Sequence, residues 1–591
     1  MIALSTLCYI LVGILVVKKV FGLVGFYGKQ RKMNKQAADC GKRPPRKYVG
    51  LGEEAGKIVQ DCETIVDLLK AQFEGKITAQ GLMEYTVERT ERLGRELEIT
   101  ADENFEEALR MAKERDKQLQ QCLAEGKDPF EELGCLHGIP FSVKDQINLK
   151  GTLNTMGVGS RIDNISEEDA HIVAVYKNQG GIPVVKGNTP TICLSLHSTN
   201  KVWGTAKNPW NNKRSCGGSS GGDAALLTCV NFGIGSDLGG SLRCPASFCG
   251  CMSFMPTARR QISHGNETYS EIKKGDMHPM NIVLGPITKN SDDMLRLMKV
   301  YLSEEKLKMD GLDYKLRFDQ SIYEDTLSCK KLRIGTITNY DEVLTLCPTG
   351  KRILQEAREH LTRLGHEVVE IEIPEFEEQC TSQGKLLVNQ VCHYAGIENN
   401  IHCDDLQSVN LLVNMYNGYS IIPKALSFFT KLVGETRASN ALKLLIKLDA
   451  DGFKELCKTR DRHVSQISKI FQDEKLDAIL TVPMAFPAMT PEVAEEVGLA
   501  PIAARLAIYW QFPSATIPTG VVEEDEQKYE DKLFNDIITK KIRQMMQDSK
   551  GLPLGLEIIG KPFKDEQVLA IMKILEDSFK FQEKHPYPKY E

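Results

Sequence analysis

Three short segments of the chain place hydroxyl or amino groups beside glycine-rich turns, a combination that suits nucleophilic catalysis. The first, residues 216–223 (CGGSSGGD), sets Ser219 and Ser220 among four glycines. Glycine costs conformational entropy, so this density indicates a main chain that must approach a ligand closely. A flexible Gly/Ser linker is the other interpretation. It is disfavoured because a helix is expected directly after the segment, over residues 224–230.

The second segment, residues 235–246 (GSDLGGSLRCPA), runs from an apolar strand into a glycine turn that carries Ser241. Successive backbone amides in such a turn can point together and stabilise an oxyanion. A serine directly beyond these amides is therefore a candidate nucleophile.

The third segment, residues 138–145 (GIPFSVKD), ends a short apolar strand at Lys144. Taken alone, Lys144 is more simply a surface lysine at a strand end. Beside two serines it gains another interpretation, because a serine hydroxyl needs a base at neutral pH. Burial away from acids can lower the pKa of a lysine from about 10.4 to about 7–8, which suits a general base.

In this order, the three segments resemble the amidase-signature family over about residues 135–260. The resemblance implies a Ser-Ser-Lys triad that forms an acyl-enzyme, with Ser241 as nucleophile, Ser219 as relay and Lys144 as general base. It also implies a cis peptide bond before Ser219. The remaining substrate contacts that it implies are the oxyanion-binding amides of Leu238, Gly239, Gly240 and Ser241 and the backbone carbonyl of Cys193.

Other functions stay open on the sequence alone. Residues 217–221 also fit the Gly-x-Ser-x-Gly elbow of α/β-hydrolases, in which Ser219 would be the nucleophile and a histidine the base. That motif needs a strand before it, and residues 208–216 are polar and contain a proline. A catalytically inactive, membrane-tethered binding protein and a short-chain amidase or esterase are the further alternatives.

The elements that must position these residues predict an α/β fold, in which a mixed, mostly parallel central sheet is covered by helices. Strands are expected at 141–143, 183–185, 232–235, 332–336, 367–373, 478–482, 515–522 and 554–559. Helices are expected at 169–179, 349–364 and 565–579. We divide the chain into an anchor (1–32), a helical N-terminal region of the catalytic domain (33–130) and the amidase-signature catalytic domain (131–591).

The N-terminus carries a largely apolar run without charged residues over residues 2–17, and basic residues follow as far as residue 47. A membrane span needs about 20 apolar residues, and flanking lysines can extend a shorter one. We therefore expect a single-pass transmembrane helix with the catalytic domain in the cytosol, at the endoplasmic reticulum or another endomembrane. A cleaved signal peptide is disfavoured, since no basic region precedes the run. An interfacial anchor is a further possibility.

A second apolar stretch lies within residues 419–448. The apolar residues of 421–433 recur at helical spacing, with Lys424 and Lys431 on the other side of the expected helix. A buried core helix is the more common outcome of such a composition, and a membrane-binding cap is the alternative. Together with the anchor and the family resemblance, this stretch favours lipid amides as substrates, namely N-acylethanolamines and primary fatty amides.

The bulk composition excludes several function classes. The net charge of −6 gives no overall attraction to nucleic acid. No zinc-type cysteine pairs, Rossmann fingerprint or Walker loop occur, so neither a cofactor nor a metal is expected. Scattered cysteines in apolar stretches indicate a reducing compartment. Pairing into a homodimer is an expectation from family analogy alone.

Overall fold

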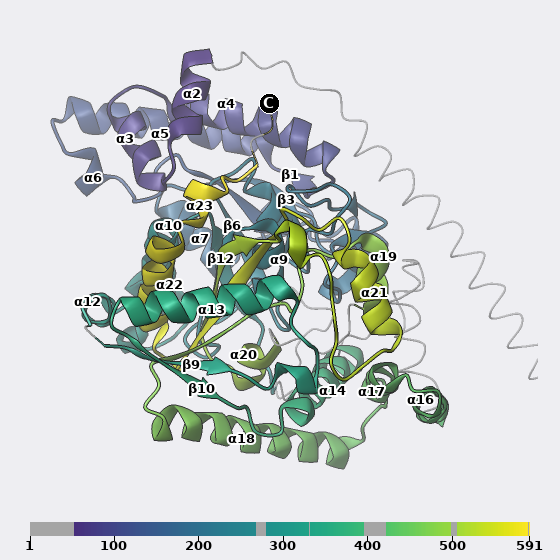
Figure 1. The fold of residues 1–591 in the computed structure, drawn as a ribbon. Coiled ribbons are helices and arrows are strands. Elements are labelled where there is room, and N and C mark those ends of the chain that lie inside the picture. The colour runs from purple at the N-terminus through teal and green to yellow at the C-terminus, as the bar shows by residue number, and fades with distance from the viewer. Residues whose placement is uncertain are drawn as a thin grey trace, which may run out of the picture.

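An eleven-stranded sheet forms the centre of the computed structural model, which describes residues 53–266, 279–329, 331–394, 421–497, 505–588 and 590 (Figure 1). Its strands are β1 (Thr100–Glu103), β2 (Pro140–Lys144), β3 (Ile182–Gly187), β6 (Phe232–Asp237), β7 (Met252–Met255), β8 (Val283–Thr288), β9 (Arg333–Ile337), β10 (Glu367–Ile371), β11 (Ala478–Thr481), β12 (Ser514–Val521) and β13 (Pro553–Gly560). They are ordered β1-β3-β2-β6-β8-β7-β12-β13-β11-β9-β10.

The predicted mixed sheet covered by helices is confirmed, but the prediction that it is mostly parallel is wrong. Among the described strands, four pairings of this sheet are parallel: β2 with β3 and β6, and β9 with β10 and β11. The other six are antiparallel. Strands such as β6, β8, β12 and β13 are buried along their whole length. Because an apolar run with both faces covered looks alike in either direction, the sequence did not reveal strand orientation.

Helices pack on the sheet at several places. They are α7 (His171–Asn178), α8 (Gly221–Leu226), α9 (Arg243–Cys249), α10 (Ser291–Tyr301), α13 (Pro348–Arg363) and α22 (Asp565–Phe579). The helix expected over residues 224–230 instead begins at Gly221, inside the glycine-rich segment. Glycines at the start of α8 therefore bring the two serines directly before a helix.

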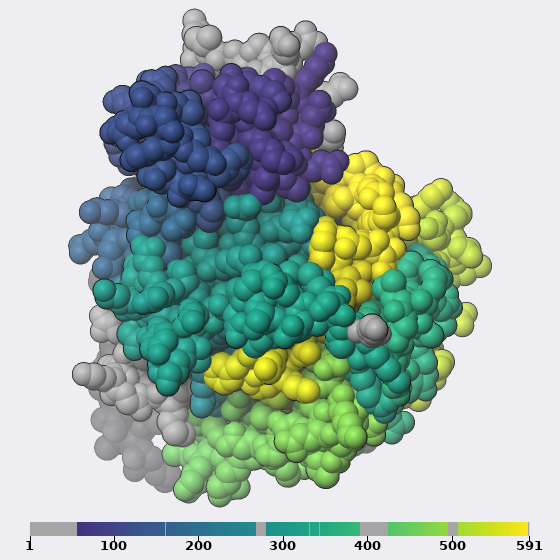
Figure 2. All heavy atoms as spheres, turned by 90° about the vertical axis from the view of Figure 1, so that its left-hand side faces the viewer, coloured from purple at the N-terminus to yellow at the C-terminus, as the bar shows by residue number. Residues whose placement is uncertain are grey.

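Four helices form the N-terminal part of the described chain, α2 (Glu53–Asp61), α3 (Ile65–Phe73), α4 (Ala79–Arg89) and α5 (Phe105–Ala124). Thr64 begins α3 with a capping box, in which Thr64 and Asp67 satisfy each other's backbone amides. Figure 2 shows this region at one end of the molecule, beside the C-terminal segment. Arg89 joins the two by donating a 2.9 Å hydrogen bond to the carbonyl of Tyr590.

The expected transmembrane anchor, residues 1–32, lies outside the described residues. No helix within the described ranges combines the length and apolar character that a membrane crossing requires.

Candidate active site

Lys144 ends β2 at the point where three parallel strands finish side by side. Its side chain is wholly buried, and its register partner on β3 is Gly187. The Nζ atom donates hydrogen bonds of 2.7 Å to Ser219 Oγ and 2.8 Å to Ser236 Oγ. Because β6 carries Ser236 and pairs with β2, the sheet itself brings this hydroxyl to the lysine.

Burial lowers the pKa of Lys144 below its ordinary value, since desolvation disfavours the ammonium form. The acidic groups that oppose this shift are Cys193, Asp223, Asp237 and Asp145. Among the described residues, none of these groups forms an ion pair with Lys144. The two hydrogen bonds of the Lys144 amine go to serine hydroxyls. A lysine whose pKa is lowered loses its proton more readily than a free lysine, and its neutral amine can accept a proton.

Ser219 lies in a tightly packed turn. The Gly218–Ser219 peptide bond is cis, as the family resemblance implied. A Cβ on Gly218 would lie 2.4 Å from the carbonyl oxygen of Ser195, so only glycine fits there. The Thr189 hydroxyl donates a 2.8 Å hydrogen bond to the Ser219 carbonyl. These contacts fix the Ser219 backbone and leave its hydroxyl directed to Lys144.

Ser241 lies in the turn that joins β6 to α9. The buried carboxylate of Asp237 holds this turn by accepting hydrogen bonds from the amides of Gly240 (2.8 Å) and Leu242 (3.0 Å) and from Arg243. Burial alone would raise the pKa of Asp237, but the neighbouring guanidinium lowers it below its ordinary value. The backbone of the turn also contacts the first segment, because the Ser220 amide donates to the Ser241 carbonyl at 3.1 Å.

The four amides expected to bind an oxyanion are not equivalent. The amide of Gly240 is occupied by Asp237. Those of Leu238, Gly239 and Ser241 have no acceptor among the described residues, and all three residues are half-buried. Three free N–H groups thus remain at the rim of the site, where they can donate to a developing oxyanion.

Cys193 lies on a second strained turn beside Ser219. Ile192 and Cys193 have φ angles of 53° and 58°, a left-handed conformation that costs a side-chain-bearing residue roughly 1–2 kcal/mol. The Cys193 thiol lies 3.2 Å from the hydroxyl of Thr189, the residue that also holds Ser219. Thr189 therefore joins the Cys193 turn to the turn that carries Ser219.

Comparison with known proteins identifies the family to which a chain with these site residues belongs. Residues 81–569 match the amidase family. The chain belongs to the amidases.

Two relatives and one solved structure illustrate where this amidase lies within the family. Vitamin D3 hydroxylase-associated protein of Gallus gallus is 32% identical over 318 residues, which are 53% of this chain and 64% of that protein. Fatty-acid amide hydrolase 1 of Sus scrofa is 27% identical over 484 residues, 78% of each protein. A solved structure of a fatty acid amide hydrolase superimposes on this chain with a TM-score of 0.74 at 22% sequence identity. The superposition includes 94% of this chain and 95% of the other, which shows that the two share a fold.

The sequence analysis missed two residues of the amidase site, Ser236 and Thr189. Ser236 stands one residue before Asp237 on β6, and its 2.8 Å contact with Lys144 follows from strand pairing. The sequence did offer a signal for Ser236, because a serine stands there inside an apolar strand directly before the turn of Ser241. Thr189 gave no such signal, because its contact with Ser219 joins two turns that are 30 residues apart in the sequence.

One group of potential metal ligands occurs among the described residues of the amidase, and it lies outside the site. Glu375, Glu378 and His463 have ligand atoms within 4.8 Å of one another. Arg462 already forms ion pairs with both carboxylates. This group is therefore explained as an ion-pair network.

Proposed function

We propose that this amidase hydrolyses amides of long-chain fatty acids, such as N-acylethanolamines and primary fatty amides, through an acyl-enzyme on Ser241. The observation that carries the proposal is the 2.7 Å hydrogen bond between the buried Lys144 and Ser219. A buried amine that has serine hydroxyls as its polar contacts is suited to take and return protons rather than to bind a carboxylate.

The proposed reaction begins when neutral Lys144 accepts the proton of Ser219 while Ser219 takes the proton of Ser241. The Ser241 oxygen attacks the amide carbon, and the negative charge on the carbonyl oxygen is stabilised by the amides of Leu238, Gly239 and Ser241. The same relay then returns a proton to the leaving nitrogen, the C–N bond breaks, and the amine departs. Water hydrolyses the remaining Ser241 ester and releases the fatty acid.

The lipid part of the proposal is supported by an exposed apolar surface on α16 (Ile421–Leu432), which lies at the edge of the molecule in Figure 1. Its exposed side chains are those of Leu426, Phe428, Phe429 and Leu432, and that of Val433 directly after the helix, between 43% and 75% accessible. Of the two sequence interpretations, a buried core helix does not hold for these residues. Contiguous exposed apolar side chains mark protein or membrane interaction sites. Lys424 and Lys431, both exposed, would suit anionic head groups.

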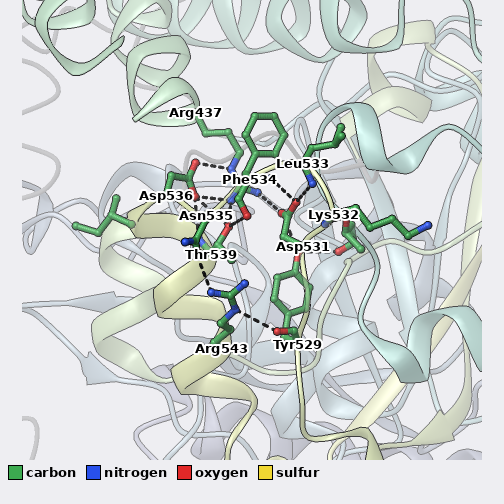
Figure 3. Close-up of polar contacts among 12 residues, drawn as sticks. Arg437, Tyr529, Asp531, Lys532, Leu533, Phe534, Asn535, Asp536, Thr539 and Arg543 are labelled. Atoms are coloured by element: carbon green, nitrogen blue, oxygen red, sulfur yellow. Dashed lines mark hydrogen bonds and ion pairs between the residues drawn. The ribbon is translucent and has the colours of Figure 1, made fainter. Parts of the chain in front are cut away.

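The α16 surface is attached firmly to the catalytic domain through α17 (Thr436–Leu444). Arg437 on α17 is buried and donates hydrogen bonds to Asp531 (3.0 Å), to Asp536 (2.8 Å) and to Thr539 (Figure 3). The Phe534 ring lies 4.6 Å from the same guanidinium. Since α16 packs against α17, this cluster would hold a membrane-binding face in a fixed position relative to the active site.

A hydrolysis panel that crosses acyl length with amine, ethanolamine and ester leaving groups tests the substrate class. We expect long-chain amides to give the highest kcat/KM, because each buried methylene contributes about 0.8 kcal/mol. A preference for acetyl or propionyl amides would identify a short-chain amidase instead. A preference for esters would identify an esterase.

A fluorophosphonate probe tests the catalytic assignment. We expect mass spectrometry to find the adduct on Ser241 and the Ser241→Ala variant to remain unlabelled. An adduct on Ser219 would contradict the assigned roles. Absence of any adduct on the folded wild-type chain would indicate an inactive binding protein.

A further inference from the structure

Asp223 is a buried carboxyl group that the proposed reaction does not use. It lies in the first turn of α8, four residues after Ser219, and is wholly inaccessible to solvent. Its Oδ1 atom accepts a 2.8 Å hydrogen bond from Ser142, whereas Oδ2 has no hydrogen-bond partner. A buried, unsatisfied carboxylate oxygen is costly, so its retention beside a catalytic lysine requires an explanation.

Two strand glycines define where this carboxyl group lies. A Cβ on Gly187 would come within 2.4 Å of Asp223 Oδ1, and a Cβ on Gly233 would lie 3.2 Å from Asp223 Cβ. Gly187 is the register partner of Lys144, and Gly233 is that of Ser142. Ser142 and Lys144 are two residues apart on β2 and so share one face of the sheet. Asp223 therefore lies on that face, beside Lys144.

Other titratable groups surround this corner, and they differ from Asp223 in how their charge is compensated. The groups that interact electrostatically with Lys144 or Asp223 are Lys186 on β3, Cys193 and Cys216 in the adjoining turns, Asp145 after β2 and Asp237 at the end of β6. Asp237 is paired with Arg243, and Asp145 accepts three hydrogen bonds from residues 155–157. Asp223 has one side-chain hydrogen bond, from Ser142, and no ion pair among the described residues.

We propose that Asp223 is a positioning residue whose carboxylate sets the proton affinity of Lys144 through space, without a direct hydrogen bond. This inference rests on the proposed function, since it acts through Lys144 as the base. A carboxylate close to an amine favours the ammonium form and raises the amine's pKa. Asp223 would therefore stabilise Lys144 in the step in which the lysine holds the proton before returning it to the leaving nitrogen.

The electrostatics of Asp223 agree with such a role. Burial raises the pKa of Asp223 to about 7, and the contact with Ser142 and the charge of Lys144 oppose that rise. The charge of Asp223 therefore changes near neutral pH. An ionised Asp223 strengthens proton binding by Lys144, and a protonated Asp223 weakens it.

The test is the pH dependence of Ser241 labelling by a fluorophosphonate, measured on the full chain. Asp223→Asn keeps the shape of the side chain but cannot ionise, so the acid limb of the profile should move to lower pH, by on the order of one unit. Ser142→Ala removes the hydrogen bond that favours ionised Asp223. It should move the limb in the same direction by a smaller amount.

Asp293→Asn is the matched control. Asp293 is also a buried carboxyl group, and burial raises its pKa to about 6, but it binds the amide of Ile65 at the N-terminal helices. This variant should keep the wild-type limb. The inference is overturned if folded Asp223→Asn keeps the wild-type limb. If that variant does not fold, an unshifted limb in Ser142→Ala overturns it. A wild-type profile without an acid limb would instead refute Lys144 as the base, and this inference with it.

Discussion

Thr189 donates a 2.8 Å hydrogen bond from its hydroxyl to the backbone carbonyl of Ser219. Both residues are buried, and neither belongs to a regular helix or strand. The Ser219 hydroxyl accepts a hydrogen bond from Lys144, so the Thr189 contact orients a turn of the candidate site that lacks secondary structure to support it.

Replacing Thr189 by Val should therefore reduce kcat for amide hydrolysis by about tenfold, because the lost hydrogen bond contributes about 1–1.5 kcal/mol to the position of Ser219. Steady-state kinetics on a long-chain amide would measure this. Thr288→Val is the control, since Thr288, the last residue of β8, is equally buried and donates a 2.8 Å hydrogen bond to the carbonyl of Asn290. Equal losses in the two variants would remove the positioning role.

Lys144→Ala should impair amide hydrolysis more than ester hydrolysis. The lysine would activate Ser241 in both reactions, but an amine leaving group also needs the returned proton, whereas an alkoxide leaves more easily. Matched amide and ester substrates with the same acyl chain would give the two values of kcat/KM. Equal losses on both substrates would show that Lys144 does not return a proton.

The rate of the wild-type enzyme should rise with pH through the lowered pKa of Lys144. Below that pKa the lysine is an ammonium and cannot accept a proton, and above it the neutral amine is the active form. Because burial lowers this pKa, the midpoint should fall below the value of about 10.4 of free lysine. Single-turnover measurements, in which chemistry limits the rate, would check this. A profile that is flat from about pH 6 to pH 9 would contradict a lysine base.

The local elements of this fold could be predicted where the sequence carries a strong period. The strand at 554–559 and the helix at 565–579 correspond to β13 and α22, because an apolar run and an amphipathic repeat are encoded locally. Strands β1, β7 and β8 were not predicted. β1 (TADE) is short and polar, and it lies at an edge of the sheet.

The candidate site was predictable from motifs, but its supporting contacts were not. Lys144, Ser219 and the turn of Ser241 each belong to a recognisable segment, and the structure brings Lys144 and Ser219 together. The contacts of Ser236 and Thr189 depend on strand order and on packing between distant turns. No periodicity in a single sequence encodes such contacts.

Arg437→Met should destabilise the protein by about 3–5 kcal/mol, because Asp531 and Asp536 would then be buried without their cation. Thermal melting would measure the loss. Arg462→Met is the matched control: Arg462 also pairs with two carboxylates, but it is exposed to solvent, which screens such pairs, so its loss should lower the melting temperature far less. If the two variants melt alike, the Arg437 cluster shown in Figure 3 does not stabilise the domain.

Changing Phe428 and Phe429 together to Ser should weaken liposome binding and slow the hydrolysis of long-chain amides. The two side chains are 62% and 63% exposed. Removing their rings therefore leaves no cavity in the core and should not unfold the chain. Apolar rings that enter a bilayer contribute binding energy in proportion to the area that they bury. The background should be a chain that lacks residues 1–32, so that any anchor does not mask the effect, and co-sedimentation with anionic vesicles gives the binding. Short-chain amides, which are delivered from water, should be hydrolysed at unchanged rates. If the folded double variant binds vesicles and turns over long-chain amides as before, α16 is not the surface through which lipid substrates arrive.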